Sequence, residues 1–215
     1  MNTLFSADSA LMRGLGTLAD VMLLNLVFIA TALPVVTLGA SLTALNFTAM
    51  RIATGRCNSV TGDYFRSFRQ NFRQATVIGL LLAAFALVLA AWYVVVTNLA
   101  VGPLAELLLL AVWYILAFTF ATTTIFVFPY LASFEGRTRE VLRTARQLSW
   151  KHPLTALGAL AIIGLAVAVT VFVPQATAYG LLWFLVGFAG IATVNGLLFA
   201  RVFGKYAPQT TTTQP

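Results

Sequence analysis

The sequence predicts an all-α fold, a polytopic transmembrane bundle of six membrane helices with short cytoplasmic amphipathic helices. Of its 215 residues, 60% are hydrophobic and only 9% are charged, and the mean hydropathy is +0.91. This composition leaves too little polar surface to coat a water-soluble globule, and several apolar runs exceed the roughly 20 residues needed to cross a bilayer. We expect residues 1–206 to form a single transmembrane domain and residues 207–215 to form a disordered tail.

The apolar stretch of residues 17–54 is too long for one straight membrane helix. Its 38 residues would measure about 57 Å as a helix, against a hydrocarbon core of about 30 Å. Pro34 and Gly39 can break it, which predicts helices over residues 17–33 and 39–54 that meet at a non-helical corner. A hairpin at this corner gives six crossings in total. If the broken pair is one crossing, whose second part ends in the interface, the total is five.

Two acidic residues stand where helices are expected to begin. Thr17 and Asp20 resemble a capping box that opens the first helix, and the Asp20 carboxylate would then lie near the positive end of the helix dipole. Asp63 precedes a second helical pattern, where its side chain suits the N-cap.

Residues 61–76 form a basic and aromatic segment between two apolar runs. On a helix, its rings gather on one face and its arginines on another, a pattern typical of a helix at a membrane surface. We expect the rings to lie at the acyl boundary and the guanidinium groups among anionic lipid headgroups. The aromatic residues are Tyr64, Phe65, Phe68 and Phe72, and the arginines are Arg66, Arg69 and Arg73.

A second charged loop, residues 133–153, repeats this pattern. Its arginines line one side of a predicted helix and its apolar side chains line the other. The arginines are Arg139, Arg143 and Arg146, and the apolar residues are Val141, Leu142, Ala145 and Leu148.

Four further apolar runs predict the remaining membrane helices. Pro103 suits the first turn of a helix, whereas Pro129 is expected to bend the end of the same span. A tight turn around Pro174 separates the last two spans. The four spans are residues 77–96, 104–131, 154–173 and 178–203.

The distribution of positive charge predicts the orientation of the chain. Loops 51–75 and 133–153 each contain five Lys or Arg residues, whereas the turns at 98–103 and 174–177 contain none. Positive loops remain on the cytoplasmic side, so we expect both basic loops and the C-terminus to be cytoplasmic in a plasma-membrane protein. The net charge of +7 favours anionic lipid headgroups as partners rather than nucleic acid, since no soluble domain is available to present it.

The sequence contains no pattern typical of an active site. His152 is the only histidine and Cys57 the only cysteine, so a histidine-based metal site and an internal disulfide are both excluded. Glycine-rich phosphate loops and nucleophile elbows are also absent from the sequence. We therefore expect no catalytic, cofactor-binding or metal-binding residues, no cofactor, and no enzymatic activity.

Polar residues inside the apolar runs are the remaining candidates for function. A polar side chain facing lipid is costly, so Asn25, Asn46 and Asn195 need partners or a cavity. They can tie helices together or line a solute pathway. The break from Pro34 to Gly39 has the same two interpretations, a plain hairpin corner or the discontinuous helix of a transporter.

Small residues recur every fourth position in the last predicted helix. Such a stripe lets another helix approach closely, and internal packing and homodimerisation explain it equally well. The residues are Ala192, Gly196, Ala200 and Gly204.

The first third of the chain resembles a known family. The segments LNL at residues 24–26, ALPVVTLGA at 32–40, MR at 50–51 and DYFRSFRQNFRQA at 63–75 are similar to those of the YesL family of bacterial integral membrane proteins. The resemblance is most specific over residues 20–76, and the later half agrees mainly in its alternation of spans and basic loops.

The YesL resemblance implies a multi-pass bacterial plasma-membrane protein without an established biochemical function. It implies an accessory role in carbohydrate uptake, with components of a carbohydrate ABC transporter as partners, and it carries over no binding residue. The alternative function is a small solute transporter or channel that acts alone or as a homodimer.

Overall fold

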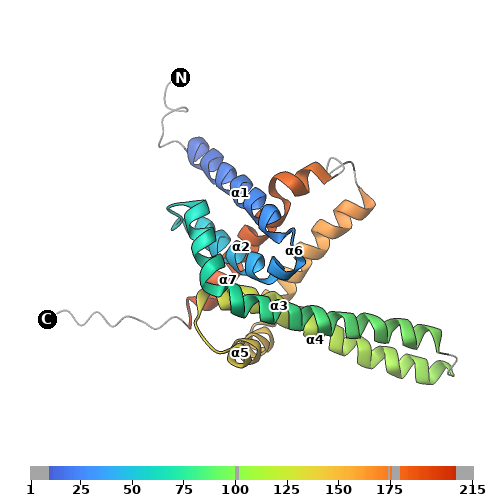
Figure 1. The fold of residues 1–215 in the computed structure, drawn as a ribbon. Helices are drawn as coiled ribbons and strands as arrows, with labels where there is room; N and C mark the ends of the chain where they lie inside the picture. Colours follow the sequence, from blue (N-terminus) through green and yellow to red (C-terminus); the bar gives the residue numbers. More distant parts are fainter. Residues whose placement is uncertain (1–9, 100–101, 174, 176–179, 207–215) are drawn as a thin grey trace.

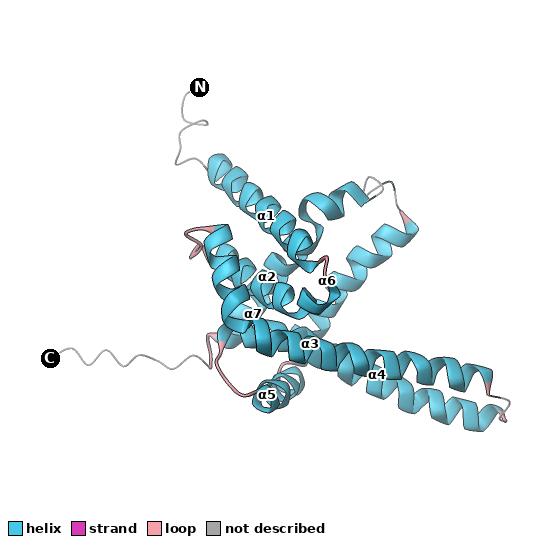
Figure 2. Cartoon of the chain, viewed as in Figure 1, coloured by secondary structure: helices cyan, strands magenta, loops and turns pink. Residues whose placement is uncertain are grey.

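The computed structural model describes residues 10–99, 102–173, 175 and 180–206, and Figure 2 shows helices and no strand in this part of the chain. This confirms the predicted all-α polytopic bundle. The predicted tail at 207–215 and the turn at Pro174 lie outside the described residues. The α-helices labelled in Figure 1 are α1 (Ala10–Ala32), α2 (Leu38–Ala53), α3 (Val60–Asn98), α4 (Pro103–Ser133), α5 (Thr138–Lys151), α6 (Pro153–Phe172) and α7 (Phe188–Phe203).

Six helical segments in the described part of the chain are long and apolar enough to cross a bilayer. Only α5, which is short and strongly charged, falls outside this set. The last segment begins with a π-helical turn, Trp183–Gly187, that leads directly into α7. The count equals the larger of the two predicted numbers of crossings, because α1 and α2 are separate helices.

The corner between α1 and α2 lies at the predicted break. Pro34 has no backbone N–H and cannot continue α1, and one 3-10 turn, Val35–Thr37, follows it. The Thr37 hydroxyl donates to the carbonyl oxygens of Thr31, at 2.6 Å, and of Pro34, at 2.7 Å. These bonds fix the corner, and Figure 1 shows α2 turning back along α1 as a helical hairpin.

The predicted start of the first helix is wrong. α1 already includes Ala10, and the Thr17 hydroxyl donates to the carbonyl oxygen of Arg13 at 3.0 Å inside the helix instead of capping it. Asp20 therefore lies well inside α1 and not in its first turn. The apolar pattern continues upstream of Thr17, and helix propagation is easier than starting a new helix.

The basic segment and the following span form one continuous helix, α3, rather than two separate elements. Its 39 residues measure about 58 Å at the usual helical rise. Ser59 is the N-cap, because its hydroxyl accepts the N–H of Gly62 at 3.2 Å, so the prediction of Asp63 as the cap is wrong. Figure 1 shows the first turns of α3 running in a different direction from its apolar remainder.

The α4 helix begins at Pro103, as predicted, with the proline in its first turn. A first-turn residue needs no partner for its N–H, which proline lacks. The helix continues through Pro129 to Ser133, two positions beyond the expected end. The basic loop that follows contains α5, whose start is fixed by the backbone N–H of Arg137 donating to a Glu140 carboxylate oxygen at 2.9 Å.

The buried core surrounds α2, which packs against α1, α3, α4 and α7. Figure 1 shows the α3–α4 hairpin extending from this core as a long arm, while α6 and the segment before α7 diverge from it in another direction. The outer surface of the arm is apolar and exposed, as a lipid-facing surface should be. Its exposed side chains include Leu80, Leu81, Leu87, Leu104, Leu107 and Ile115.

The two basic loops and the C-terminal end of α7 meet at one end of the molecule, which we call the basic end. Gln74 in α3 donates to the carbonyl oxygen of Gly136, in the second loop, at 2.7 Å. His152, between α5 and α6, shares a hydrogen bond of 3.0 Å with the Tyr206 hydroxyl after α7. The C-terminal end of α3 and the N-terminal end of α4 lie at the far tip of the arm (Figure 1).

Candidate functional site

Asn25 joins α1 to the last membrane segment through three hydrogen bonds. Its amide nitrogen donates to the carbonyl oxygens of Trp183, at 2.9 Å, and Phe184, at 2.6 Å. Its amide oxygen accepts the N–H of Ala189 at 2.9 Å. A π-helical turn displaces backbone groups from their usual partners, and the buried Asn25 side chain replaces some of them. These are the contacts of a helix-packing residue.

The two residues of the predicted break have different surroundings. Pro34 is exposed at the corner, whereas Gly39 is buried where α2 meets α3. A Cβ atom on Gly39 would lie 2.2 Å from the carbonyl oxygen of Ala75 and 3.3 Å from the Cα of Gly79. Only glycine fits this helix crossing. Neither Pro34 nor Gly39 lines the cavity between α1, α2, α4, α6 and the last membrane segment.

The candidate ligand site is a cavity of about 440 Å³ enclosed by α1, α2, α4, α6 and the last membrane segment, which we call the intramembrane cavity. Its walls are largely aromatic and aliphatic. The ring of Phe188 packs against two other rings, with its centroid 5.4 Å from that of Phe28 and 5.1 Å from that of Trp183. The Trp183 indole N–H is held by the Thr170 hydroxyl at 2.7 Å. The volume falls within the roughly 300–1,000 Å³ of small-molecule sites.

Three polar side chains line the intramembrane cavity: Asn46, Thr124 and Asn195. The amide nitrogen of Asn46 donates to the carbonyl oxygen of Leu42 at 2.8 Å. The Thr124 hydroxyl and the amide oxygen of Asn195 are buried without a hydrogen-bond partner. Two of the three predicted asparagines therefore meet in one site, to which Asn25 does not contribute.

Among the residues that the structure describes, those lining the intramembrane cavity include no charged side chain and no histidine. It can enclose a neutral apolar group and offer it an acceptor, but its side chains do not include a general base or an anion-binding group. No group of three His, Cys, Asp or Glu side chains that could hold a metal ion occurs in the part of the chain that the structure describes.

The first turns of α3 present a mixed surface of arginines and rings, the α3 basic face. Arg66, Arg69 and Arg73 are exposed, and Phe65 and Phe72 expose 40% and 36% of their surface beside them. Positive charges flanking exposed rings suit a membrane interface.

Tyr64 departs from the expected lipid-facing row of rings. It is fully buried, and its hydroxyl shares a hydrogen bond with the Thr31 hydroxyl of α1. The aromatic row of the sequence is thus divided between the protein core and the exposed surface, because the α1–α2 hairpin covers one side of α3.

The α5 helix also packs its apolar side against protein. Val141, Ala145 and Leu148 are buried in the core that α4 and α7 share, rather than exposed to lipid. The three arginines on the opposite side, Arg139, Arg143 and Arg146, are exposed. They form a second basic surface at the basic end.

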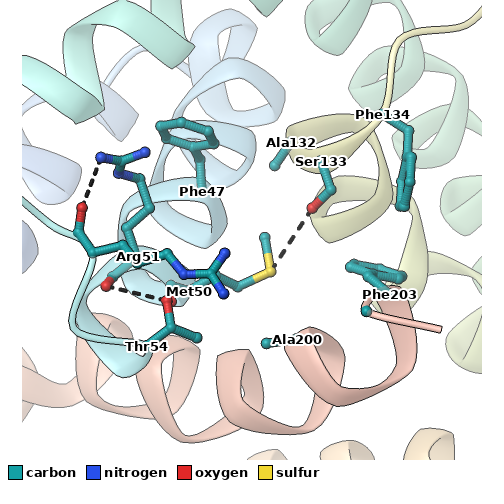
Figure 3. Close-up of a pocket in the computed structure, with 11 residues that line it drawn as sticks. Phe47, Met50, Arg51, Thr54, Ala132, Ser133, Phe134, Ala200 and Phe203 are labelled. Carbon is teal, nitrogen blue, oxygen red and sulfur yellow. Dashed lines mark hydrogen bonds between the residues drawn. The ribbon is translucent and has the colours of Figure 1, made fainter. Parts of the chain in front are cut away.

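A smaller pocket of about 350 Å³ opens at the basic end between α2, α4 and α7. Figure 3 shows Met50 pointing toward Ser133, with Phe134 and Phe203 beside it. Arg51, at its edge, donates to Asp63 at 2.7 Å and to the carbonyl oxygen of Arg56 at 2.7 Å. Arg51 is thus held in place by the first turn of α3 and by the loop between α2 and α3.

Cys57 lies in that same loop. Burial, and then the hydrogen bond and charge of Asp63, raise the pKa of the Cys57 thiol to about 11. The more distant Asp20 adds to this effect, and Arg51 opposes it. The thiol is therefore protonated at neutral pH and is a poor nucleophile.

Sequence reasoning missed Thr124 and the π-helical turn. Threonines are routine in membrane helices, where their hydroxyls usually bond to the preceding turn, so Thr124 is distinguished only by its missing bond together with its position in the cavity wall. The predicted small-residue stripe is partly explained: a Cβ atom on Gly196 would lie 3.2 Å from the Cα of Met50 in α2, so this part of α7 packs internally.

Six apolar helices around a buried core define the class of the chain, a multi-pass helical membrane protein. Within this class, residues 21–99 match the family described as "Protein of unknown function, DUF624". The matched region runs from α1 through the whole of α3, and so includes Asn25, the corner and the α3 basic face. No curated protein and no solved structure matches the chain significantly.

Proposed function

We propose that this chain is a non-enzymatic bacterial plasma-membrane protein that attaches to anionic lipid through its basic end and serves as an accessory to carbohydrate uptake. The observation that carries the proposal is the meeting of both basic loops at one end of the molecule, joined by the bond from Gln74 to Gly136. The positive-inside rule assigns such an end to the cytoplasm. The C-terminus and, in a six-crossing arrangement, the N-terminus are then cytoplasmic as well.

Impermeant cysteine labelling in intact cells tests this orientation. Cys57 is first replaced by serine, and cysteine is then introduced as Gly102→Cys at the tip of the arm or as Glu135→Cys at the basic end. We expect an external maleimide to label the Gly102→Cys variant at once and the Glu135→Cys variant only after permeabilisation. The reverse pattern would refute the proposed orientation.

The accessory role rests on the resemblance of residues 20–76 to the YesL family, an argument by analogy. Nearly all of this stretch lies within the DUF624 match, which itself carries no activity. Components of a carbohydrate ABC transporter are the proposed partners. Purification from the native membrane in mild detergent should recover them with the chain, and recovery of a lone monomer would count against the role.

A second candidate is a small solute transporter or channel, acting alone or as a homodimer. The intramembrane cavity favours it, because Asn46 and Asn195 both line this space. Replacing either asparagine by alanine should then abolish solute flux in reconstituted vesicles while leaving expression unchanged. Absence of flux with every tested solute would exclude this candidate but not the accessory role.

A further inference from the structure

Asn195 has an unsatisfied acceptor at the wall of the intramembrane cavity. The residue is only 4% exposed, and its amide oxygen has no hydrogen-bond partner in the part of the chain that the structure describes. Leaving a buried polar group unpaired costs about 1–3 kcal/mol, and inside a bilayer no bulk water is available to replace the partner. A donor from a bound molecule would remove this cost.

The rest of the cavity restricts the chemistry of that molecule. Thr124 contributes a second buried, unpaired oxygen, from α4, whereas most other lining residues are apolar. Since none of the described residues that line the cavity is charged, an anionic or cationic group would lose its hydration without compensation. A sugar would leave most of its hydroxyls unpaired against these walls, so carbohydrate is also disfavoured.

The α4 and α6 helices, both apolar and long enough to cross a bilayer, contribute to the wall of the cavity, so an opening between them would face lipid rather than water. The cavity lies between α4, on the arm, and α6, and these helices diverge in Figure 1. Phe120, Leu160 and Ile163 line it and are partly exposed. A molecule dissolved in the bilayer can reach the site by passing these apolar side chains.

We propose that the intramembrane cavity binds a neutral, largely apolar molecule with a single hydroxyl or N–H donor, which donates to the amide oxygen of Asn195. The apolar body of the ligand fills the aromatic walls, and Thr124 offers a further acceptor and donor. This site is independent of the accessory role, because it requires neither the basic end nor a partner protein.

Quenching of Trp183 tests the proposal, because this indole lines the cavity and bromine quenches indole fluorescence on contact. The full chain in detergent is titrated with 12-bromododecan-1-ol or with 1-bromododecane, which lacks the hydroxyl. We expect saturable quenching by the alcohol and at least tenfold weaker binding of the bromoalkane. The saturable part should disappear in a Trp183→Phe variant.

The Asn195→Leu variant should bind the alcohol about tenfold more weakly. The control variant Asn98→Leu, which loses an amide outside the cavity, should bind the alcohol as the wild type does. Ala121→Phe, which fills the cavity from α4, provides a second blocking variant if Asn195→Leu does not fold. Equal binding of the alcohol and the bromoalkane, non-saturable quenching, or undiminished binding by Asn195→Leu and Ala121→Phe would overturn the proposal.

Discussion

Two asparagines of the same chain have opposite surroundings, and their side chains therefore serve different purposes. Asn25 makes three hydrogen bonds across helices, whereas the amide oxygen of Asn195 makes none. Hydrogen bonds between membrane helices stabilise packing only when both partners are present. Asn25 therefore holds the fold together, and Asn195 costs stability that a ligand can restore.

Replacing each asparagine by leucine should separate these roles. Asn25→Leu removes all three hydrogen bonds and leaves the buried Ala189 N–H without the acceptor it has in the wild type, so we expect a loss of about 2–4 kcal/mol in stability. Asn195→Leu removes an unpaired acceptor and should be neutral or stabilising. Thermal melting of the purified chain in detergent measures both, with exposed Asn98→Leu as control. Equal losses at Asn25 and Asn195 would contradict the assignment.

Cys57 should react slowly with alkylating reagents. With a pKa of about 11, only about one thiol in a thousand is ionised at pH 8, roughly two hundredfold fewer than in an ordinary cysteine with a pKa of about 8.5. The thiolate fraction rises with pH up to the folded pKa, so the rate should increase about tenfold per pH unit. Asp63→Asn removes the carboxylate that helps to raise the pKa of the thiol, so it should accelerate labelling of Cys57. An unchanged labelling rate would show that Asp63 does not raise this pKa.

At the scale of elements, the crossing of α2 and α3 depends on a glycine with no room for a side chain. Gly39→Ala would place a methyl group against Ala75 and Gly79, and overpacking of this kind costs about 1–3 kcal/mol. At Gly164, inside α6, a Cβ atom would meet no neighbouring group within 4 Å, so Gly164→Ala should gain about 0.5–1 kcal/mol from helix propensity. Thermal melting of the two variants should therefore show shifts of opposite sign.

The sequence predicts those elements whose signals are local. Pro34 ends α1 because it cannot donate a helical hydrogen bond, Pro103 begins α4 for the complementary reason, and the alternation within α5 separates its buried and exposed sides. The predicted start of α1 at Thr17 was wrong. Extending an existing helix through this four-residue capping pattern is easier than starting a new helix there. Local patterns predict where a helix breaks better than where it begins.

The rest depends on contacts between distant parts of the chain. Tyr64 belongs to the same helical pattern as Phe65, and only the covering α1–α2 hairpin decides which ring is buried. Likewise, Asn195 was a predicted candidate, but the cavity also needs Thr124 from α4, which no sequence spacing connects to it. Single-sequence patterns find polar residues in apolar spans, and tertiary packing decides whether they are paired.

At the scale of the whole molecule, positive charge is concentrated at the basic end, whereas the arm is largely apolar. The α3 basic face and the α5 arginines are both exposed at the basic end. Among the described residues where α3 ends and α4 begins, at the tip of the arm, Glu106 is the one charged side chain. Each Lys or Arg near an anionic membrane surface contributes about 1 kcal/mol of attraction. Three arginines on one exposed helix face are thus enough to favour an anionic leaflet.

Reversing the charge of the α3 basic face should remove this preference. In the wild-type chain we expect phosphatidylglycerol to raise the melting temperature more than phosphatidylcholine does. This difference should shrink in high salt, because the screening length falls from about 10 Å at about 0.1 M salt to about 3 Å at about 1 M. The combined change of Arg66, Arg69 and Arg73 to glutamate should abolish it, whereas changing all three to lysine preserves the charge and should retain it. Because these side chains are exposed, the reversal should leave the core intact. If the glutamate variant kept both its preference for phosphatidylglycerol and its orientation in cells, the basic face would have no role at the membrane.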